Sequence, residues 1–427
     1  MTLNQEMARF IDSSPTAFHV TANLAAALEK EGYRRLYAYE DWSELPDGKY
    51  YTTQNDSTLI AFRLEKGRNG FMITASHSDS PLFKLKDHPT RRTPESYVKL
   101  NTERYGGLNL GSWFDRPLSI AGRVIVQEDG ALTSRLIDFS SDAAIIPSVA
   151  GHLTKGMNAE MKDPKTDLIP LFSMGSEEFF RRRVAELAGA DENAIIARDL
   201  YLYNHMPATI WGEEGELISS PRLDDLQCAF TSFKAFLDAD AGKSIPVLCV
   251  FDNEEVGSST KQGANSDYLC SVLRRIAGAA YDRMLPGSFL VSADNAHAVH
   301  PNHPELSDGA ERPVVNGGLV IKFNANQSYT TDSVSASVLR MVCTQAGVPM
   351  QVYSNRSDLP GGSTLGNIAT THLPIRAADI GAAQLAMHSA FETAGTKDTV
   401  YLYEAMKTFF SASLSEGPDR LQVCFGR

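Results

Sequence analysis

A short apolar run, Ile245–Phe251, is the feature that most restricts how this chain can fold. It has the length of a strand and carries no charge, which indicates a strand that is buried on both faces. Such strands belong to parallel sheets that helices cover on both sides, and ligands bind where the strands end. Glu254 and Glu255 follow this run closely. Two like charges beside a dry core need a compensating partner.

We interpret the two glutamates as part of a divalent-metal site, with Glu255 as a ligand and Glu254 as the general base for a metal-activated water. The alternative is a pair of solvated surface glutamates. Further side chains that can bind metals follow other predicted strands or precede an apolar helix. These are His77, Asp79, Asp224, Asp225, Asp294 and His388. Any one of them alone could be a hydrogen-bonded histidine, a charge at a helix N-terminus or a turn residue.

The mixture of these side chains indicates the kind of metal. Histidines and carboxylates without a thiolate suit zinc, cobalt or manganese better than magnesium alone. About five ligands are too many for one tetrahedral ion, and two ions that share a bridging carboxylate need about this number.

Predicted strands and helices alternate along most of the chain, which indicates a mixed, mostly parallel sheet flanked by helices. Between residues 84 and 206 the pattern is different. A glycine-rich stretch at 105–112 is followed by strands at 118–126 and 132–139 around an Asp-Gly turn, which predicts a hairpin. We therefore expect an α/β domain made of residues 1–83 and 207–427, with a β-rich insertion at residues 84–206.

Charge and composition exclude several classes of partner. The net charge of −12 argues against nucleic acids and anionic membranes, because both require a basic face. The five cysteines lie far apart without a CxxC pair, which indicates reduced thiols rather than a disulfide framework. The N-terminus lacks the pattern of a signal peptide, and no uncharged apolar run has the length of a transmembrane helix. We expect a soluble cytoplasmic protein.

Five motifs, in order, resemble those of the aspartyl aminopeptidases of the M18 family, which are dinuclear zinc peptidases. The motifs are SHSDSP (76–81), SPRLDDL (220–226), FDNEEVGS (251–258), SADNAHAVHPN (292–302) and LAMHS (385–389). The resemblance implies that Asp224 bridges two zinc ions. His77 and Asp294 would complete one site, and Glu255 and His388 would complete the other.

The same resemblance implies a reaction, namely the removal of N-terminal Asp or Glu from peptides by attack of a metal-bridging water. Glu254 would be the general base for this water. Asp79 would lie behind His77 and fix its tautomer.

Substrate-binding residues are implied in the same way. Lys322 and Tyr329 match the stretch that faces the substrate side chain, and residues 361–364 resemble the substrate-side loop. The alternative for Lys322 is a surface lysine at a strand end. His152 matches a histidine that reaches the active site of a neighbouring subunit, and its alternative is a plain loop histidine. His297, His300 and His303 are read as loop histidines without a metal role.

The insertion resembles the dimerisation domain of this family, which implies a homododecamer built from dimers. Two other functions remain open from the sequence. One is a dinuclear-metal aminopeptidase of broader specificity, or an amide deacylase of related fold. The other is a self-assembling scaffold without turnover.

Overall fold

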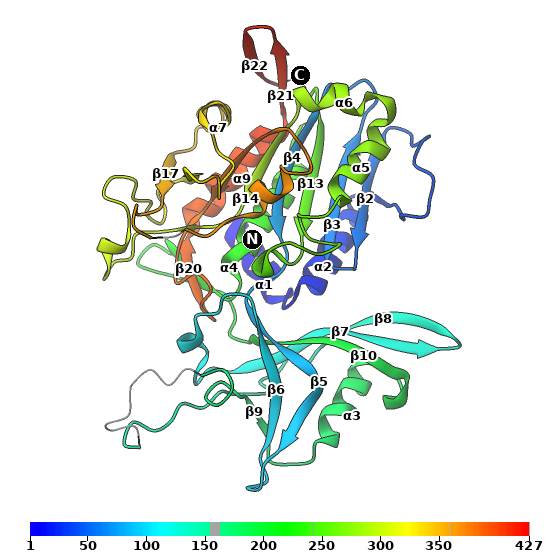
Figure 1. Ribbon diagram of the computed structural model, residues 1–427, viewed down its shortest axis with the longest axis vertical. Coiled ribbons are helices and arrows are strands. Elements are labelled where there is room, and N and C mark those ends of the chain that lie inside the picture. Colours follow the sequence, from blue (N-terminus) through cyan, green and yellow to red (C-terminus); the bar gives the residue numbers. More distant parts are fainter. Residues whose placement is uncertain (154–162, 241, 360, 427) are drawn as a thin grey trace.

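A nine-stranded sheet forms the upper part of the computed structural model, which describes residues 1–153, 163–240, 242–359 and 361–426 (Figure 1). The central strands β13, β4, β14 and β18 run parallel to one another, whereas β3 and β16 join this group antiparallel. In spatial order the strands are β1 (Arg34–Arg35), β2 (Gly48–Gln54), β3 (Thr58–Leu64), β13 (Ile245–Phe251), β4 (Phe71–His77), β14 (Phe289–Ala293), β18 (Arg376–Gly381), β16 (Leu319–Phe323) and β17 (Met350–Ser354).

Helices cover both faces of this sheet. Successive residues of its central strands point to opposite faces, and both sets are apolar, so each face needs a covering layer. In β13, Leu248 and Val250 belong to one core, whereas Val247 and Cys249 belong to the other. The first core includes residues of α1 (Leu3–Asp12), α2 (Ala17–Lys30), α4 (Leu223–Asp238), α7 (Ser333–Ala346) and α9 (Thr396–Phe410). The second includes residues of α5 (Tyr268–Ala277), α6 (Tyr281–Met284) and α8 (Leu365–Ala369). The predicted mixed, mostly parallel sheet flanked by helices is confirmed. Among the described helices, none has the length and apolar composition needed to cross a bilayer.

A separate six-stranded sheet, antiparallel throughout, lies below the first one (Figure 1). Its strands, in spatial order, are β8 (Ala131–Asp138), β7 (Leu118–Glu128), β10 (Ile195–Asn204), β5 (Leu82–Arg92), β6 (Val98–Tyr105) and β9 (Leu171–Ser173). Phe180 of α3 (Glu178–Ala188) belongs to the same hydrophobic core as Phe83 and Trp113. The predicted hairpin is confirmed by β7 and β8. The division of the chain into two domains at the predicted boundaries stays a prediction.

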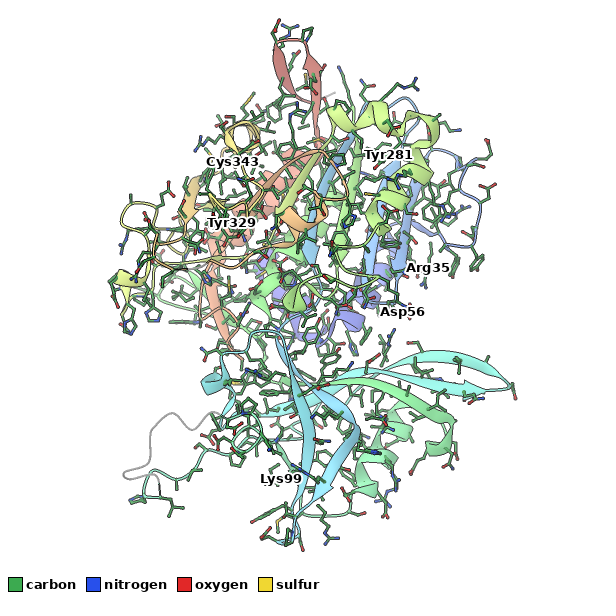
Figure 2. The ribbon with its side chains drawn as sticks, viewed as in Figure 1. Arg35, Asp56, Lys99, Tyr281, Tyr329 and Cys343 are labelled. Atoms are coloured by element: carbon green, nitrogen blue, oxygen red, sulfur yellow. The ribbon has the colours of Figure 1, made fainter. Side chains whose placement is uncertain are left out.

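The two parts meet at the edge where the central strands end. The chain passes from the end of β4 at His77 directly into β5, which starts at Leu82. Arg123 of β7 lies 4.3 Å from the Phe18 ring centroid and donates a hydrogen bond of 2.8 Å to the carbonyl of Asn55. Figure 2 shows Asp56 beside this junction, and the Asp56 carboxylate lies 3.9 Å from the Arg123 guanidinium. The antiparallel sheet is therefore attached at the edge of the large sheet where a ligand site is expected.

A small five-stranded sheet completes the same edge. Its order is β11 (Thr209–Trp211), β12 (Leu217–Ser220), β20 (Glu392–Gly395), β19 (Ala383–Leu385) and β15 (Ala296–His297). The turn between β19 and β20 carries His388, and β15 starts just after Asp294. A C-terminal hairpin of β21 (Ala412–Gly417) and β22 (Arg420–Phe425) projects from the opposite end of the molecule (Figure 1).

Candidate active site

The predicted metal ligands come from five separate segments and meet at one place. His77 is the last residue of β4, and the strand register pairs it with Phe251 at the end of β13. This pairing places the turn that carries Glu255 beside His77. Asp224 lies at the start of α4, Asp294 follows β14, and His388 lies between β19 and β20.

Three groups of side chains each bring one ligand atom per residue within 4.8 Å of one another. One group holds His77, Asp224, Asp225 and Asp294, a second holds His77, Glu254 and Glu255, and a third holds Asp224, Glu255 and His388. The structure therefore brings together every metal ligand that was expected from the sequence. One group also contains Asp225, which was counted from the sequence among the side chains that can bind metals but was not assigned as a ligand.

Asp224 lies between the two histidines. Its Oδ1 is 3.5 Å from His77 Nε2, and its Oδ2 is 3.6 Å from His388 Nε2. His388 Nε2 is also 3.4 Å from Glu255 Oε2. One carboxylate thus faces two separate ligand groups, one through each oxygen, which is the arrangement that a bridging ligand requires.

The hydrogen bonds of the histidines indicate their tautomers. His77 Nδ1 lies 3.0 Å from the carbonyl oxygen of Asp79, and His388 Nδ1 lies 2.9 Å from the carbonyl oxygen of Gly107. A carbonyl only accepts, so each Nδ1 carries the hydrogen. In the neutral form of each ring, Nε2 holds the lone pair and faces the carboxylates, as a metal ligand requires.

Asp79 fixes the surroundings of His77. Its Oδ1 lies 3.4 Å from His77 Nδ1, and its carboxylate accepts hydrogen bonds from the backbone N–H groups of Glu254 (3.1 Å) and Glu255 (3.2 Å). The hydroxyl of Tyr105 donates to Asp79 Oδ2 at 2.7 Å. One buried carboxylate therefore links the first histidine to the turn that carries both glutamates.

The charges of the site fit a divalent cation. Asp224 Oδ1, Asp225 Oδ1 and Glu255 Oε1 are buried and have no hydrogen-bond partner among the described residues. Burial is the main cause that raises the pKa of Glu254 to about 8 and that of Asp294 to about 6. Such a concentration of buried negative charge is costly without a compensating cation.

The pKa of the second histidine, His388, depends on the same buried carboxylates. Burial lowers the pKa of His388, but the Asp224 and Glu255 carboxylates that face it outweigh burial and raise the pKa to about 10. A donor set of imidazole and carboxylate groups without a thiolate suits zinc.

A cavity of about 260 Å³ opens in front of these residues. Glu254, Lys322 and Tyr329 line it together with four of the candidate ligands, namely His77, Asp224, Asp294 and His388. Lys322 is only 2% exposed. Its Nζ donates to the carbonyl of Asn295 at 3.1 Å and lies 3.8 Å from Asp294 Oδ1. The Tyr329 ring centroid is 5.2 Å from the same nitrogen. The alternative of a surface lysine is therefore wrong.

The remaining histidines and the predicted loop have different positions. His297 also lines the cavity, which its interpretation as a plain loop histidine did not anticipate, and so do Gly362, Ser363 and Thr364 of the predicted loop. His152 lies in an exposed turn of the inserted segment, and its role at a neighbouring subunit stays a prediction.

Sequence reasoning missed the contribution of the Tyr105-Gly106-Gly107 stretch. Besides Tyr105, which contacts Asp79, the two glycines lie against the ligands. A Cβ on Gly106, which has a φ of +76°, would come within 3.1 Å of Glu255 Cβ, and a Cβ on Gly107 would come within 3.3 Å of His388 Nδ1. The glycine doublet after a strand was a usable signal, because such pairs often mark a close backbone approach.

Glu392 of β20 was also missed. Its carboxylate accepts from the backbone N–H of Asp224 at 3.0 Å and from that of His388 at 2.7 Å. The side chain is 1% exposed. It therefore holds the backbone of two candidate ligands at once. Its only signal in the sequence is its place shortly after His388.

The sequence profile of the family described as "Aminopeptidase I zinc metalloprotease (M18)" matches residues 10–410. The chain belongs to the M18 family. This M18 protein is therefore a zinc metalloaminopeptidase. It is similar to the "Probable M18 family aminopeptidase 2" of Clostridium novyi, with 42% identity over 423 residues that cover 95% of this chain and 98% of that protein.

Solved structures support the same fold. The chain superimposes on a chain of the Ape4 and Nbr1 complex with a TM-score of 0.91 and 33% identity, covering 96% of this chain and 85% of that one. It superimposes on the mApe1 dodecamer of S. cerevisiae with a TM-score of 0.85 and 28% identity, covering 95% of each chain.

Proposed function

We propose that this M18 aminopeptidase removes N-terminal Asp and Glu residues from peptides with the help of two zinc ions. The observation that carries the proposal is the meeting of two histidines, the carboxylate ligands and Glu254 around one cavity whose wall contains the buried cation of Lys322. A buried ammonium group is a suitable partner for a substrate carboxylate. The complete site argues against a scaffold without turnover.

His77, Asp224 and Asp294 would hold one ion, and Asp224, Glu255 and His388 would hold the second. The two histidines on opposite oxygens of Asp224 support its bridging role. Bound zinc supplies a Lewis acid that activates water and polarises the peptide carbonyl. Cobalt or manganese would suit the same donors.

Glu254 acts as the general base in this proposal. It accepts the proton of the attacking water and passes it to the leaving amine. Its backbone N–H is held by Asp79, and its side chain lines the cavity. Without a bound metal, burial raises the pKa of its carboxyl to about 8, and cations bound beside it would lower this value again.

The variant E254Q tests this role. The amide has the same shape but accepts no proton, so turnover should fall by about 10²- to 10⁴-fold while the zinc content stays unchanged. Zinc is measured by atomic emission and turnover with an Asp-linked chromogenic substrate. A near wild-type rate would refute the assignment.

Lys322 and Tyr329 would recognise the acidic side chain of the substrate. The variant K322M removes the cation and retains most of the apolar volume, so kcat/KM should fall for Asp- and Glu-linked substrates much more than for a Leu-linked one. Equal losses on all three would exclude this role. A wild-type enzyme that cleaves all three substrates equally well would support the aminopeptidase of broader specificity.

We also propose that the chain assembles into a homododecamer built from dimers, as the similarity to the mApe1 dodecamer suggests. The antiparallel sheet would form the dimer contact. Exposed apolar side chains such as Leu132 (66%) and Leu153 (72%) support this role. His152 would then reach the active site of the neighbouring subunit. Light scattering gives the mass of the particle, and a loss of activity in H152A without loss of assembly would support the role of His152.

A further inference from the structure

We infer that Asp379 is a positioning residue that fixes two walls of the substrate cavity. One wall is the loop that carries Tyr329, and the other is the turn of Gly362, Ser363 and Thr364. The inference rests on the proposed function in so far as it assigns this cavity to the substrate side chain.

Asp379 lies in β18, is fully buried and bonds to both walls. Its Oδ2 accepts a hydrogen bond from the backbone N–H of Thr330 at 2.6 Å, and its Oδ1 accepts one from the hydroxyl of Thr364 at 2.5 Å. Its own backbone N–H donates to the hydroxyl of Thr331 at 2.9 Å. A single residue of the rigid sheet thus holds two segments that are more than 30 positions apart in the sequence.

The hydroxyl of Thr364 bonds to Asp379 instead of capping its own helix. Thr364 occupies the N-cap position of α8, where a threonine hydroxyl usually accepts from the first turn of its own helix. Here the side chain makes no capping bond, and its hydroxyl points to Asp379 instead. Gly366 allows the close approach, because a Cβ there would come within 2.9 Å of Asp379 Oδ1 and 2.7 Å of Ser292 Cβ.

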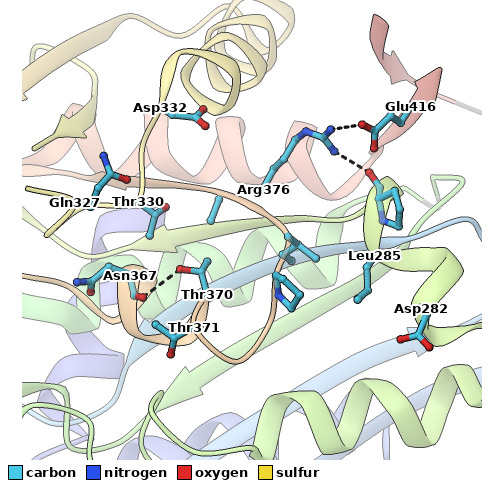
Figure 3. A pocket seen from close by; sticks show the side chains of 14 residues that line it. Asp282, Leu285, Gln327, Thr330, Asp332, Asn367, Thr370, Thr371, Arg376 and Glu416 are labelled. Atoms are coloured by element: carbon cyan, nitrogen blue, oxygen red, sulfur yellow. Dashed lines mark hydrogen bonds and ion pairs between the residues drawn. The ribbon is translucent and has the colours of Figure 1, made fainter. Parts of the chain in front are cut away.

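The two walls depend on these hydrogen bonds, which we call the Asp379 tether, because the cavity lies on one side of them and an outer groove on the other. Tyr329 and Thr364 line the cavity of about 260 Å³. The next residues along the chain face an outer groove of about 830 Å³, which Thr330, Asn367 and Thr370 line (Figure 3). A layer with little material behind it gains little from packing, so directed hydrogen bonds must set its position.

Asp379 also lies directly opposite Lys322, the cation of the cavity. Asp379 and Lys322 are direct cross-strand partners of the antiparallel pair β18 and β16, so their side chains lie on the same face of the sheet. Asp379 therefore sets the distance of both walls from Lys322. Among the described residues, Asp379 forms no hydrogen bond or ion pair with a candidate metal ligand and acts on Asp294 only through its charge. Its loss should therefore change substrate recognition more than metal binding.

The variants T364V and D379A test the inference, with T364S and D379N as matched controls. Valine keeps the branched shape of Thr364 and removes the hydroxyl, whereas serine keeps the hydroxyl. Asparagine removes the charge of Asp379 and retains one acceptor for Thr330 and one donor for the oxygen of Thr364. Each variant is assayed as the full-length, zinc-loaded enzyme with Asp-, Glu- and Leu-p-nitroanilide, together with zinc content and melting temperature.

We expect T364V and D379A to raise KM for the Asp substrate by about tenfold, a free-energy change of about 1.4 kcal/mol. Their kcat and zinc content should stay within about twofold of wild type, and the kcat/KM ratio of Asp to Leu should fall. T364S should restore the wild-type KM, and D379N should lie nearer to wild type than D379A. A merely structural role would lower the melting temperature without changing KM, and T364S would then show no selective rescue.

The inference is overturned if T364V leaves KM and the Asp-to-Leu ratio within twofold of wild type, whatever the folding of D379A. A wild-type enzyme that prefers Leu would instead remove the proposed acidic specificity. The positioning role of Asp379 is then tested by comparing KM of the same variants for the preferred substrate. Failure of the acidic specificity and failure of the positioning role can therefore be distinguished.

Discussion

Removal of one hydroxyl in the inserted segment, in the variant Y105F, should weaken zinc binding at a site formed by the other part of the chain. Tyr105 lies at the end of β6, and its hydroxyl donates to Asp79 Oδ2 at 2.7 Å. Asp79 in turn faces His77 Nδ1 through both its carbonyl and its carboxylate. The hydroxyl therefore acts on the ligand through a single intermediate residue.

The magnitude follows from this arrangement. A hydrogen bond to a charged group contributes about 1.5–3 kcal/mol. Asp79 keeps the bonds from the N–H groups of Glu254 and Glu255, so it becomes less restrained but is not released. Loss of a group behind a metal ligand commonly lowers metal affinity by about 10- to 100-fold, which corresponds to about 1.4–2.8 kcal/mol. Because Tyr105 lies behind Asp79, which itself lies behind the ligand His77, we expect zinc affinity to fall by about tenfold, the lower end of this range.

The assay is a competition titration of the metal-free enzyme against a chromophoric zinc chelator. Y201F is the matched control, because the Tyr201 ring packs edge-on against Tyr105 at 5.7 Å between centroids but its hydroxyl does not bond to Asp79. Y201F should bind zinc like the wild type. Equal zinc affinity of Y105F and Y201F would show that Asp79 does not depend on the inserted segment.

Two further predictions concern pH and metal. Chelation should abolish activity and lower the melting temperature reversibly, since each ion present at 100 times its Kd contributes about 2.7 kcal/mol. The decrease in melting temperature should be larger at pH 8 than at pH 6. The pKa values of Asp294 (about 6) and Glu254 (about 8) are raised, so their uncompensated charges appear as the pH rises through this range. Scanning calorimetry with and without added zinc measures it, and a larger decrease at pH 6 would contradict the charge argument. Burial lowers the pKa of His19 to about 4, so the unfolded chain takes up a proton before the folded one as the pH falls. The free energy of unfolding should therefore decrease by about 2 kcal/mol more in the wild type than in H19Q between pH 7.5 and 5 in urea titrations, and parallel curves would exclude this contribution.

The sequence determined the parts of this protein that depend on local pattern. The uninterrupted apolar run of β13 requires burial on both faces, and the alternation of strands and helices then requires a sheet covered on both sides. The position of His77, Asp294 and the two glutamates after such strands places them at one edge, because the carboxyl ends of parallel strands meet there. This is why the candidate ligands were predictable.

Only the tertiary structure decided how these side chains are held. Gly107 and His388 are 281 positions apart, and Asp79 lies between β4 and β5 whereas Tyr105 ends β6. Lys322 has the sequence signature of a surface residue at a strand end, yet its burial follows from its neighbours β17 and β18 and from the Tyr329 loop. Contacts of this kind form when segments distant in the sequence pack together, so the local hydrophobic periodicity of the sequence does not predict them. For the same reason Glu392 and Asp379, which hold the ligands and the cavity walls, could be recognised only once the chain was folded.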